Sequence, residues 1–221
     1  YGHGGSLPGF KNHVLIAPEH GIGVVLLSNR EATDPLGLAL DVIAAGLGAT
    51  LPPATTALPD GLFAADDGGP FWIELAQGRI TFLGATEQLF DSGEGWAISR
   101  SPYMWIRLRH EGGAIAGEIN HVGRRFVAVP RDAAPDPAWA GRWRNEALGA
   151  QFEVTVAAGR ATLSMGTGPL RTAMPLVPLG AGRALGRRSD GPWAQRPCFA
   201  FAGDTCRLVT NRCRVFTFRR A

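Results

Sequence analysis

The chain has 221 residues, 45% of them hydrophobic, and this is enough for one or two domains with a packed core. Its formal net charge is only +3, its arginines are scattered, and no apolar run is long enough to span a bilayer, so neither nucleic acid nor a membrane is an expected partner. The 30 glycines and 16 prolines indicate many turns and favour a mainly β fold over a helical bundle.

The first thirty residues predict a polar, glycine-rich strand followed by a β-hairpin. The sequence His3-Gly4-Gly5-Ser6 opens the chain, and Pro8-Gly9 predicts a turn after it. Two apolar, β-branched runs follow at residues 14–17 and 22–27, separated by the turn residues 18–21. We therefore expect three adjacent strands.

A helix is expected directly after the hairpin. Pro35 suits the first helical position, and Thr33 or Asp34 is available as its N-cap. Apolar residues recur at helical spacing over residues 36–47, so this helix should cover one face of the sheet. Residues 1–52 are the expected first unit, and a Pro/Thr/Ala-rich linker follows it.

The rest of the chain consists of two similar blocks of short strands and turns. Each block opens with glycine and aromatic residues and then reaches a Gly-Arg turn, at Gly78 in the first and Gly159 in the second. The offset of about eighty residues indicates a duplicated module. We expect antiparallel, lipocalin-like barrels of about eight strands over residues 55–132 and 136–221, since closure leaves no free edge. In the first block, strands are predicted at residues 71–75, 79–83, 96–99, 104–108, 114–119 and 124–129.

The tryptophans and cysteines of these blocks are expected to be core residues. The six tryptophans should fill the barrel cores and seal the barrel ends rather than line a ligand cavity. Cys198, Cys206 and Cys213 are odd in number and lack zinc-site spacing, so buried free thiols are expected, with a Cys206–Cys213 bridge across a hairpin as the alternative. No metal or other cofactor is expected.

The opening sequence His3-Gly4-Gly5-Ser6 has two chemical interpretations. The first is the oxyanion loop of an α/β-hydrolase, which requires a downstream G-x-S-x-G nucleophile elbow. No such elbow occurs in the chain, and the expected alternation of strands and helices is missing. We therefore reject this interpretation.

The second interpretation is a resemblance to the penicillin-recognising serine hydrolases. Their third active-site motif is a basic residue, any residue and a glycine on an edge strand, and His3-Gly4-Gly5 resembles the branch that uses His-x-Gly. Gly-x-Leu-Pro-Gly-Phe at residues 5–10, Pro-Glu-x-Gly-Ile-Gly-Val-Val at 18–25 and Leu-Ser-Asn at 27–29 are similar to the family as well. Over residues 1 to about 50 the resemblance implies the closing strands and C-terminal helix of an α/β serine-hydrolase domain.

Two trailing barrels narrow the resemblance to the D-stereospecific aminopeptidases. The resemblance implies release of N-terminal D-residues from small peptides and amides through an acyl-enzyme on serine. His3 would replace the family's lysine in the proton-transfer network, and the backbone N–H of Ser6 would be an oxyanion donor. Gly4 and Gly5 would let the substrate approach the edge strand. Asp190, in a glycine-rich loop of the last barrel, would pair with the substrate's ammonium.

The family's nucleophile is absent from the chain. Lys11 is the only lysine and Pro8 precedes it by three residues, so the Ser-x-x-Lys motif cannot occur, and Tyr-x-Asn is also missing. We therefore expect a missing N-terminal catalytic portion as a partner and an inactive chain on its own. A homodimer remains open, and so does the compartment, with the cytoplasm favoured. The alternatives are a β-lactamase-like esterase with accessory barrels and a non-catalytic β-barrel protein that binds a small ligand.

Overall fold

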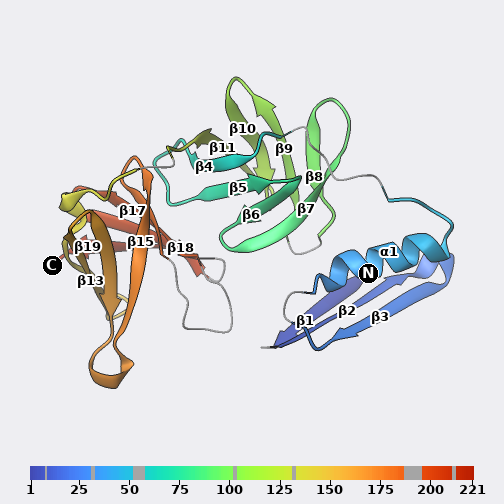
Figure 1. Ribbon diagram of the computed structural model, residues 1–221, viewed down its shortest axis with the longest axis horizontal. Helices are drawn as coiled ribbons and strands as arrows, with labels where there is room; N and C mark the ends of the chain where they lie inside the picture. Colours follow the sequence, from blue (N-terminus) through green and yellow to red (C-terminus); the bar gives the residue numbers. More distant parts are fainter. Residues whose placement is uncertain are drawn as a thin grey trace.

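The computed structural model describes residues 1–7, 9–30, 33–51, 58–101, 104–130, 133–186, 196–210 and 213–221. A three-stranded sheet with one helix comes first, and two closed antiparallel barrels follow it along the chain (Figure 1). The fold is therefore mainly β, as the glycine and proline content predicts. No helix in the described ranges has the length and apolar character needed to cross a bilayer.

The sheet has the strand order β1-β2-β3, with β1 and β3 at its two edges. Its strands are β1 (Gly2–Leu7), β2 (Phe10–Ala17) and β3 (Ile22–Ser28). The short helix η1 (Pro18–His20) joins β2 to β3 and ends at Gly21, whose φ of 62° is in the left-handed region that glycine adopts without strain. The predicted hairpin is thus present, with a single 3₁₀ turn as its connection.

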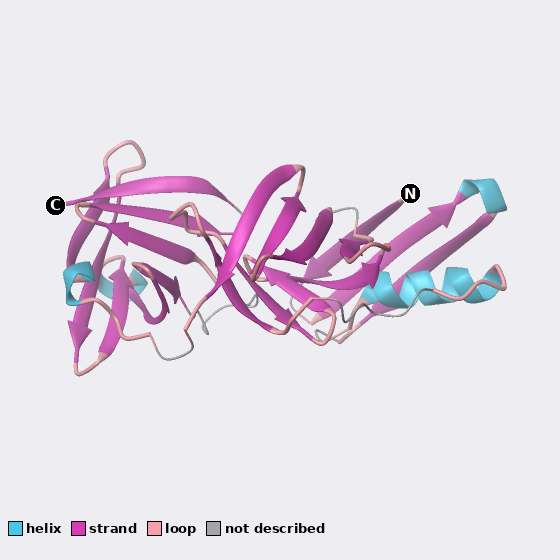
Figure 2. Ribbon diagram, turned by 90° about the horizontal axis from the view of Figure 1, so that it is seen from above, coloured by secondary structure: helices cyan, strands magenta, loops and turns pink. Residues whose placement is uncertain are grey.

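Helix α1 (Pro35–Gly46) covers one face of this sheet. The Asp34 side chain caps it by accepting a hydrogen bond from the Gly37 N–H at 3.1 Å. Ala39, Ile43 and Ala44 are buried against the strands. Figure 2 shows α1 lying alongside the long strands of the sheet.

Barrel 1, residues 61–128, closes where β11 pairs with β4. Its strands are β4 (Gly61–Ala65), β5 (Trp72–Ala76), β6 (Arg79–Phe82), β7 (Ala85–Asp91), β8 (Trp96–Ser99), β9 (Ile106–Glu111), β10 (Ala114–Ile119) and β11 (Val122–Ala128). The sequence analysis missed β4 and β7, and it began β9 two residues early. Strand β9 begins later because the Trp105 N–H donates to the Asn120 side chain, at 3.0 Å, rather than to a neighbouring strand.

Barrel 2, residues 141–220, repeats this arrangement and closes where β19 pairs with β12. Its elements are η2 (Pro137–Trp139), β12 (Gly141–Asn145), β13 (Ala150–Ala157), β14 (Arg160–Met165), η3 (Gly168–Leu170), β15 (Thr172–Gly180), β16 (Arg183–Gly186), β17 (Cys198–Ala202), β18 (Thr205–Thr210) and β19 (Cys213–Arg220). The two Gly-Arg turns occupy the same place, between the second and third strand of each barrel. Positive φ angles at Gln77 and Gly78, and at Ala158 and Gly159, match the duplicated turn chemistry.

Aromatic side chains fill much of the barrel interiors. Trp72 and Trp143 are fully buried, and Trp139 stacks on Phe201 with ring centroids 5.0 Å apart. Trp96 and Trp105 are partly exposed, and Trp96 lies under the guanidinium of Arg107. Trp193 is outside the described residues.

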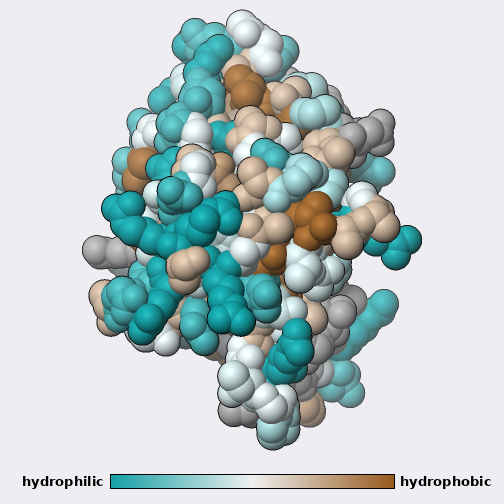
Figure 3. All heavy atoms as spheres, turned by 90° about the vertical axis from the view of Figure 1, so that its left-hand side faces the viewer, coloured by the Kyte–Doolittle hydropathy of each residue, from teal (hydrophilic) through white to brown (hydrophobic). Residues whose placement is uncertain are grey.

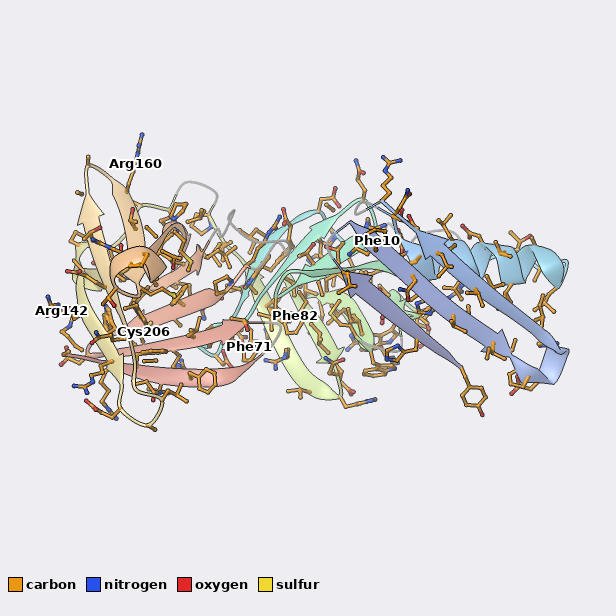
Figure 4. All side chains as sticks on the ribbon, turned by 90° about the horizontal axis from the view of Figure 1, so that it is seen from below. Phe10, Phe71, Phe82, Arg142, Arg160 and Cys206 are labelled. Atoms are coloured by element: carbon orange, nitrogen blue, oxygen red, sulfur yellow. The ribbon has the colours of Figure 1, made fainter. Side chains whose placement is uncertain are left out.

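The outer wall of barrel 2 closes one end of barrel 1. Leu179, Leu185, Cys198 and Val209 belong to the same apolar cluster as the barrel 1 core. Figure 4 shows Phe71 and Phe82 of barrel 1 beside the strands of barrel 2. The side of barrel 2 shown in Figure 3, which faces away from barrel 1, is mainly hydrophilic. The barrel 1 core therefore continues onto the outer wall of barrel 2, whereas the interior of barrel 2 forms a separate cluster.

Arg183 fixes this contact between the barrels. It is only 4% exposed, and its Nε donates to the Gly69 carbonyl at 2.7 Å while its Nη2 donates to the Ala65 carbonyl. The partly exposed Arg207 donates to the Gly68 carbonyl at 2.7 Å. The turn between β4 and β5 is thus held by two arginines of barrel 2.

Two of the cysteines are buried free thiols, as predicted. Cys198 faces barrel 1, whereas Cys206 lies in the core of barrel 2. Burial raises the pKa of both thiols above the ordinary range. The side chain of Cys213 is outside the described part of the structure. The thiol of Cys206 is free, so the alternative Cys206–Cys213 bridge is not formed.

Candidate functional site

Strand β1 carries four of the predicted site residues and lies at the edge of its sheet. Tyr1 and Ile16 exchange both backbone hydrogen bonds, at 2.7 and 2.8 Å. Because hydrogen-bonded and non-hydrogen-bonded pairs alternate in an antiparallel ladder, His3 and Gly5 direct their backbone groups toward β2. The backbone groups of Gly4 and Ser6 therefore point toward the outer edge of the sheet.

His3 and Gly5 belong to the face of the sheet that α1 leaves open. His3 is paired with Val14 and Gly5 with Asn12, and directly paired residues share a face. Val25, the partner of Val14 on β3, is 68% exposed, so this face is the open one. Figure 4 looks onto it, with α1 behind the sheet.

Ser6 reaches the outer edge through its backbone only. Its side chain alternates with those of His3 and Gly5 and so belongs to the opposite face. The Ser6 N–H, in contrast, points along the plane of the sheet toward the edge. A group lying against that edge would meet the Ser6 N–H, with His3 on the adjoining open face.

The Asn12 side chain occupies the space next to Gly5. A Cβ atom added to Gly5 would lie 2.6 Å from Asn12 Oδ1 and 2.8 Å from Asn12 Nδ2. The absence of a side chain at residue 5 therefore accommodates the Asn12 carboxamide. The sequence analysis attributed this glycine to substrate approach and did not single out Asn12, since only the strand register places Asn12 opposite Gly5.

His13 is buried behind β1, on the face that α1 covers. It is 2% exposed and is paired with Gly4. Burial lowers the pKa of His13, the neighbouring His3 lowers it further, and the carboxylate of Asp34 acts in the opposite direction. The two histidines are thus electrostatically linked across the β1–β2 ladder.

The open face is apolar around these polar groups. Leu27 is 79% exposed, and a shallow depression of about 430 Å³ is lined by Val14, Ile16 and Val25 among others. Contiguous exposed apolar surface of this kind is typical of interaction sites. Within the described residues, no element covers it.

Asp190, the fifth predicted site residue, lies in the segment 187–195, outside the described residues. The structure therefore does not test its predicted place near β1. In the described ranges, no group of three or more His, Cys, Asp or Glu side chains is arranged to hold a metal ion.

The barrel interiors bear on the ligand-carrier alternative. The described interior side chains form dense clusters, with Ile73, Leu108 and Phe126 fully buried in barrel 1 and Phe152, Phe199 and Phe218 in contact in barrel 2. Packed interiors disfavour a small-ligand carrier. No protein-family model matches the chain, and no curated protein sequence matches it.

Proposed function

We propose that this chain is the C-terminal part of a serine hydrolase of the penicillin-recognising class, most like a D-stereospecific aminopeptidase. Its substrates would be small peptides or amides with an N-terminal D-residue, cleaved through an acyl-enzyme. The nucleophilic serine and its base belong to a catalytic portion outside the chain. The chain contributes one wall of the active site and the two barrels.

The geometry of β1 is the observation that carries this proposal. An oxyanion donor must point to where negative charge develops, and the Ser6 N–H points to the outer edge of β1. A peptide substrate can add to such an edge as a further strand. His3 lies on the adjoining open face, where it would supply a hydrogen bond or positive charge to the proton-transfer network.

The apolar open face supports a missing catalytic portion. Phe10, Val14, Val25 and Leu27 are exposed on this face, and burying them would be favourable at about 25 cal/mol per Å² of apolar surface. In the proposal the catalytic portion packs here and brings its serine toward His3. The active site then forms between the two parts.

The test is a reconstitution with the catalytic portion that carries Ser-x-x-Lys. The complex should release p-nitroaniline from D-alanine p-nitroanilide and should discriminate against the L-isomer, whereas the 221-residue chain alone should not. Cleavage by the chain alone would contradict the proposal. Turnover of simple esters without turnover of the anilide would favour the esterase alternative.

Variants of the complex then test the two side-chain roles. His3→Ala should lower kcat/KM by about 100-fold, while His20→Ala, at the exposed η1 turn, should leave it unchanged. Asp190→Asn should weaken free-amine substrates far more than their N-acetylated forms. Equal effects of the two histidine variants would contradict the active-site role of His3. An equal loss for both substrate types would contradict the role of Asp190 in amine recognition.

A further inference from the structure

A pocket separate from the β1 edge lies between α1 and barrel 1. Its volume is about 410 Å³, and it is lined by the first turns of α1 and by strands β6 and β7 with the residues after β8. Asp34 and Asp41 line the pocket from α1, whereas Arg79, Glu87 and Arg100 line it from barrel 1. Charged side chains of both signs therefore face one small space.

Within the described residues, no ion pair within 4 Å joins the charged groups of the pocket, although Arg79 lies close enough to Glu87 to interact with it electrostatically. Across the ranges that the structure describes, the side chains of Arg79, Arg100 and Asp41 make neither a hydrogen bond nor an ion pair within 4 Å. The Arg100 guanidinium instead lies 4.0 Å above the ring of Phe90, which restricts its position through a cation–π contact. Two guanidinium groups are thus available to an anion in the pocket.

The opposite side of the pocket is anionic. Glu87 is half-buried, and it accepts a hydrogen bond from Ser101. Burial raises its pKa, and the carboxylate of Asp34 raises it as well because two like charges lie near each other, whereas the guanidinium of Arg79 acts in the opposite direction. A bound cation near Glu87 and Asp34 would reduce this repulsion.

We infer that this pocket binds a small zwitterion, a free amino acid or dipeptide, whose carboxylate meets Arg79 and Arg100 and whose ammonium meets Glu87 and Asp34. A guanidinium binds a carboxylate through parallel hydrogen bonds, and a carboxylate pair suits an ammonium. Leu36, Leu40 and Phe90 provide an apolar wall for a short side chain. The volume lies at the lower end of the range for small-molecule sites.

The inference does not depend on the proposed hydrolase function, because every residue of the pocket belongs to this chain. Calorimetric titration of the 221-residue chain tests it, with D-alanine, L-alanine and D-alanyl-D-alanine as probes. At least one probe should bind with a Kd of about 1 mM or lower. Its N-acetyl derivative and its amide should each bind at least about tenfold more weakly, since each lacks one charge.

Variants of the pocket provide the decisive comparison. Arg100→Gln and Glu87→Gln should each weaken binding about tenfold or more. Arg109→Gln is the matched control, because Arg109 is partly exposed and pairs with Glu111 at 2.8 Å on the same barrel. Thermal melting of each variant separates lost binding from lost folding.

Three outcomes would overturn the inference. They are absence of binding for all three probes, equal binding of the charged and the blocked forms, and unchanged binding in folded Arg100→Gln and Glu87→Gln proteins. If the reconstituted hydrolase is active but none of these probes binds, the binding inference is wrong and the proposed function stands. If a probe binds but the complex has no hydrolase activity, the proposed function is wrong and the binding inference stands.

Discussion

The carboxamide of Asn12 lies where a side chain at Gly5 would have to be, with Oδ1 2.6 Å from the position of an added Cβ. This contact links the third residue of the His-Gly-Gly sequence to the neighbouring strand. Gly117 in barrel 1 shows a different kind of requirement. Its φ is 145°, and an added Cβ would lie 2.1 Å from the backbone carbonyl oxygen of Arg107.

We therefore expect alanine at these two glycines to have unequal effects. Gly5→Ala requires only that a partly exposed amide swing aside, so it should cost less than about 1 kcal/mol of unfolding free energy. Gly117→Ala forces backbone to move at a positive φ and should cost roughly 3 kcal/mol or more. Urea unfolding of both variants measures the difference. Equal losses would mean that Asn12 cannot leave its place over Gly5.

Arg183 should contribute more to stability than its partly exposed neighbour Arg207. Replacing Arg183 by methionine leaves the buried carbonyls of Ala65 and Gly69 without its donors, which should cost about 2–4 kcal/mol. Arg207→Met loses a single bond to Gly68 near solvent and should cost less than about 1 kcal/mol. Denaturant midpoints and slopes of the two variants check this. A loss at Arg207 as large as that at Arg183 would contradict the assigned role.

The pH dependence of stability should carry a contribution from His13. Its folded pKa is lowered by burial, so the unfolded chain binds the proton more readily as the pH falls below about 6.5. The native state therefore loses stability as the pH falls, and this destabilising effect of His13 is absent well above pH 6.5. His13→Gln should flatten the fall in unfolding free energy between neutral and mildly acidic pH, measured by urea titration at each pH.

A second variant separates the causes at His13. His3→Ala removes the neighbouring charge that lowers the pKa of His13, so it should make the acid-dependent fall smaller while leaving His13 in place. An unchanged pH profile in His13→Gln would show that other groups set this slope. If His3→Ala leaves the pH profile unaltered, burial alone lowers the pKa of His13.

Much of the local structure could be predicted from the sequence because short-range chemistry determines it. Asp34 caps α1 as expected, and the two Gly-Arg turns lie at matching places in barrels that close as predicted. The register of β1 was not accessible, because an alternating pattern identifies two faces without indicating which one is covered. The pairing of β1 with β2 therefore decided which face of the sheet carries the His3 side chain and which carries the Ser6 side chain.

The sequence by itself determined the β-rich class, the hairpin and helix at the start, and the duplicated turn pattern, since each depends on neighbouring residues and their backbone preferences. Tertiary structure alone decided that Asn12 lies over Gly5, that Arg183 reaches Gly69 over 114 residues of chain, and that barrel 2 closes the end of barrel 1. These contacts join segments whose spacing carries no periodic signal. Only packing, with the need to satisfy buried carbonyls and fill apolar space, selects them.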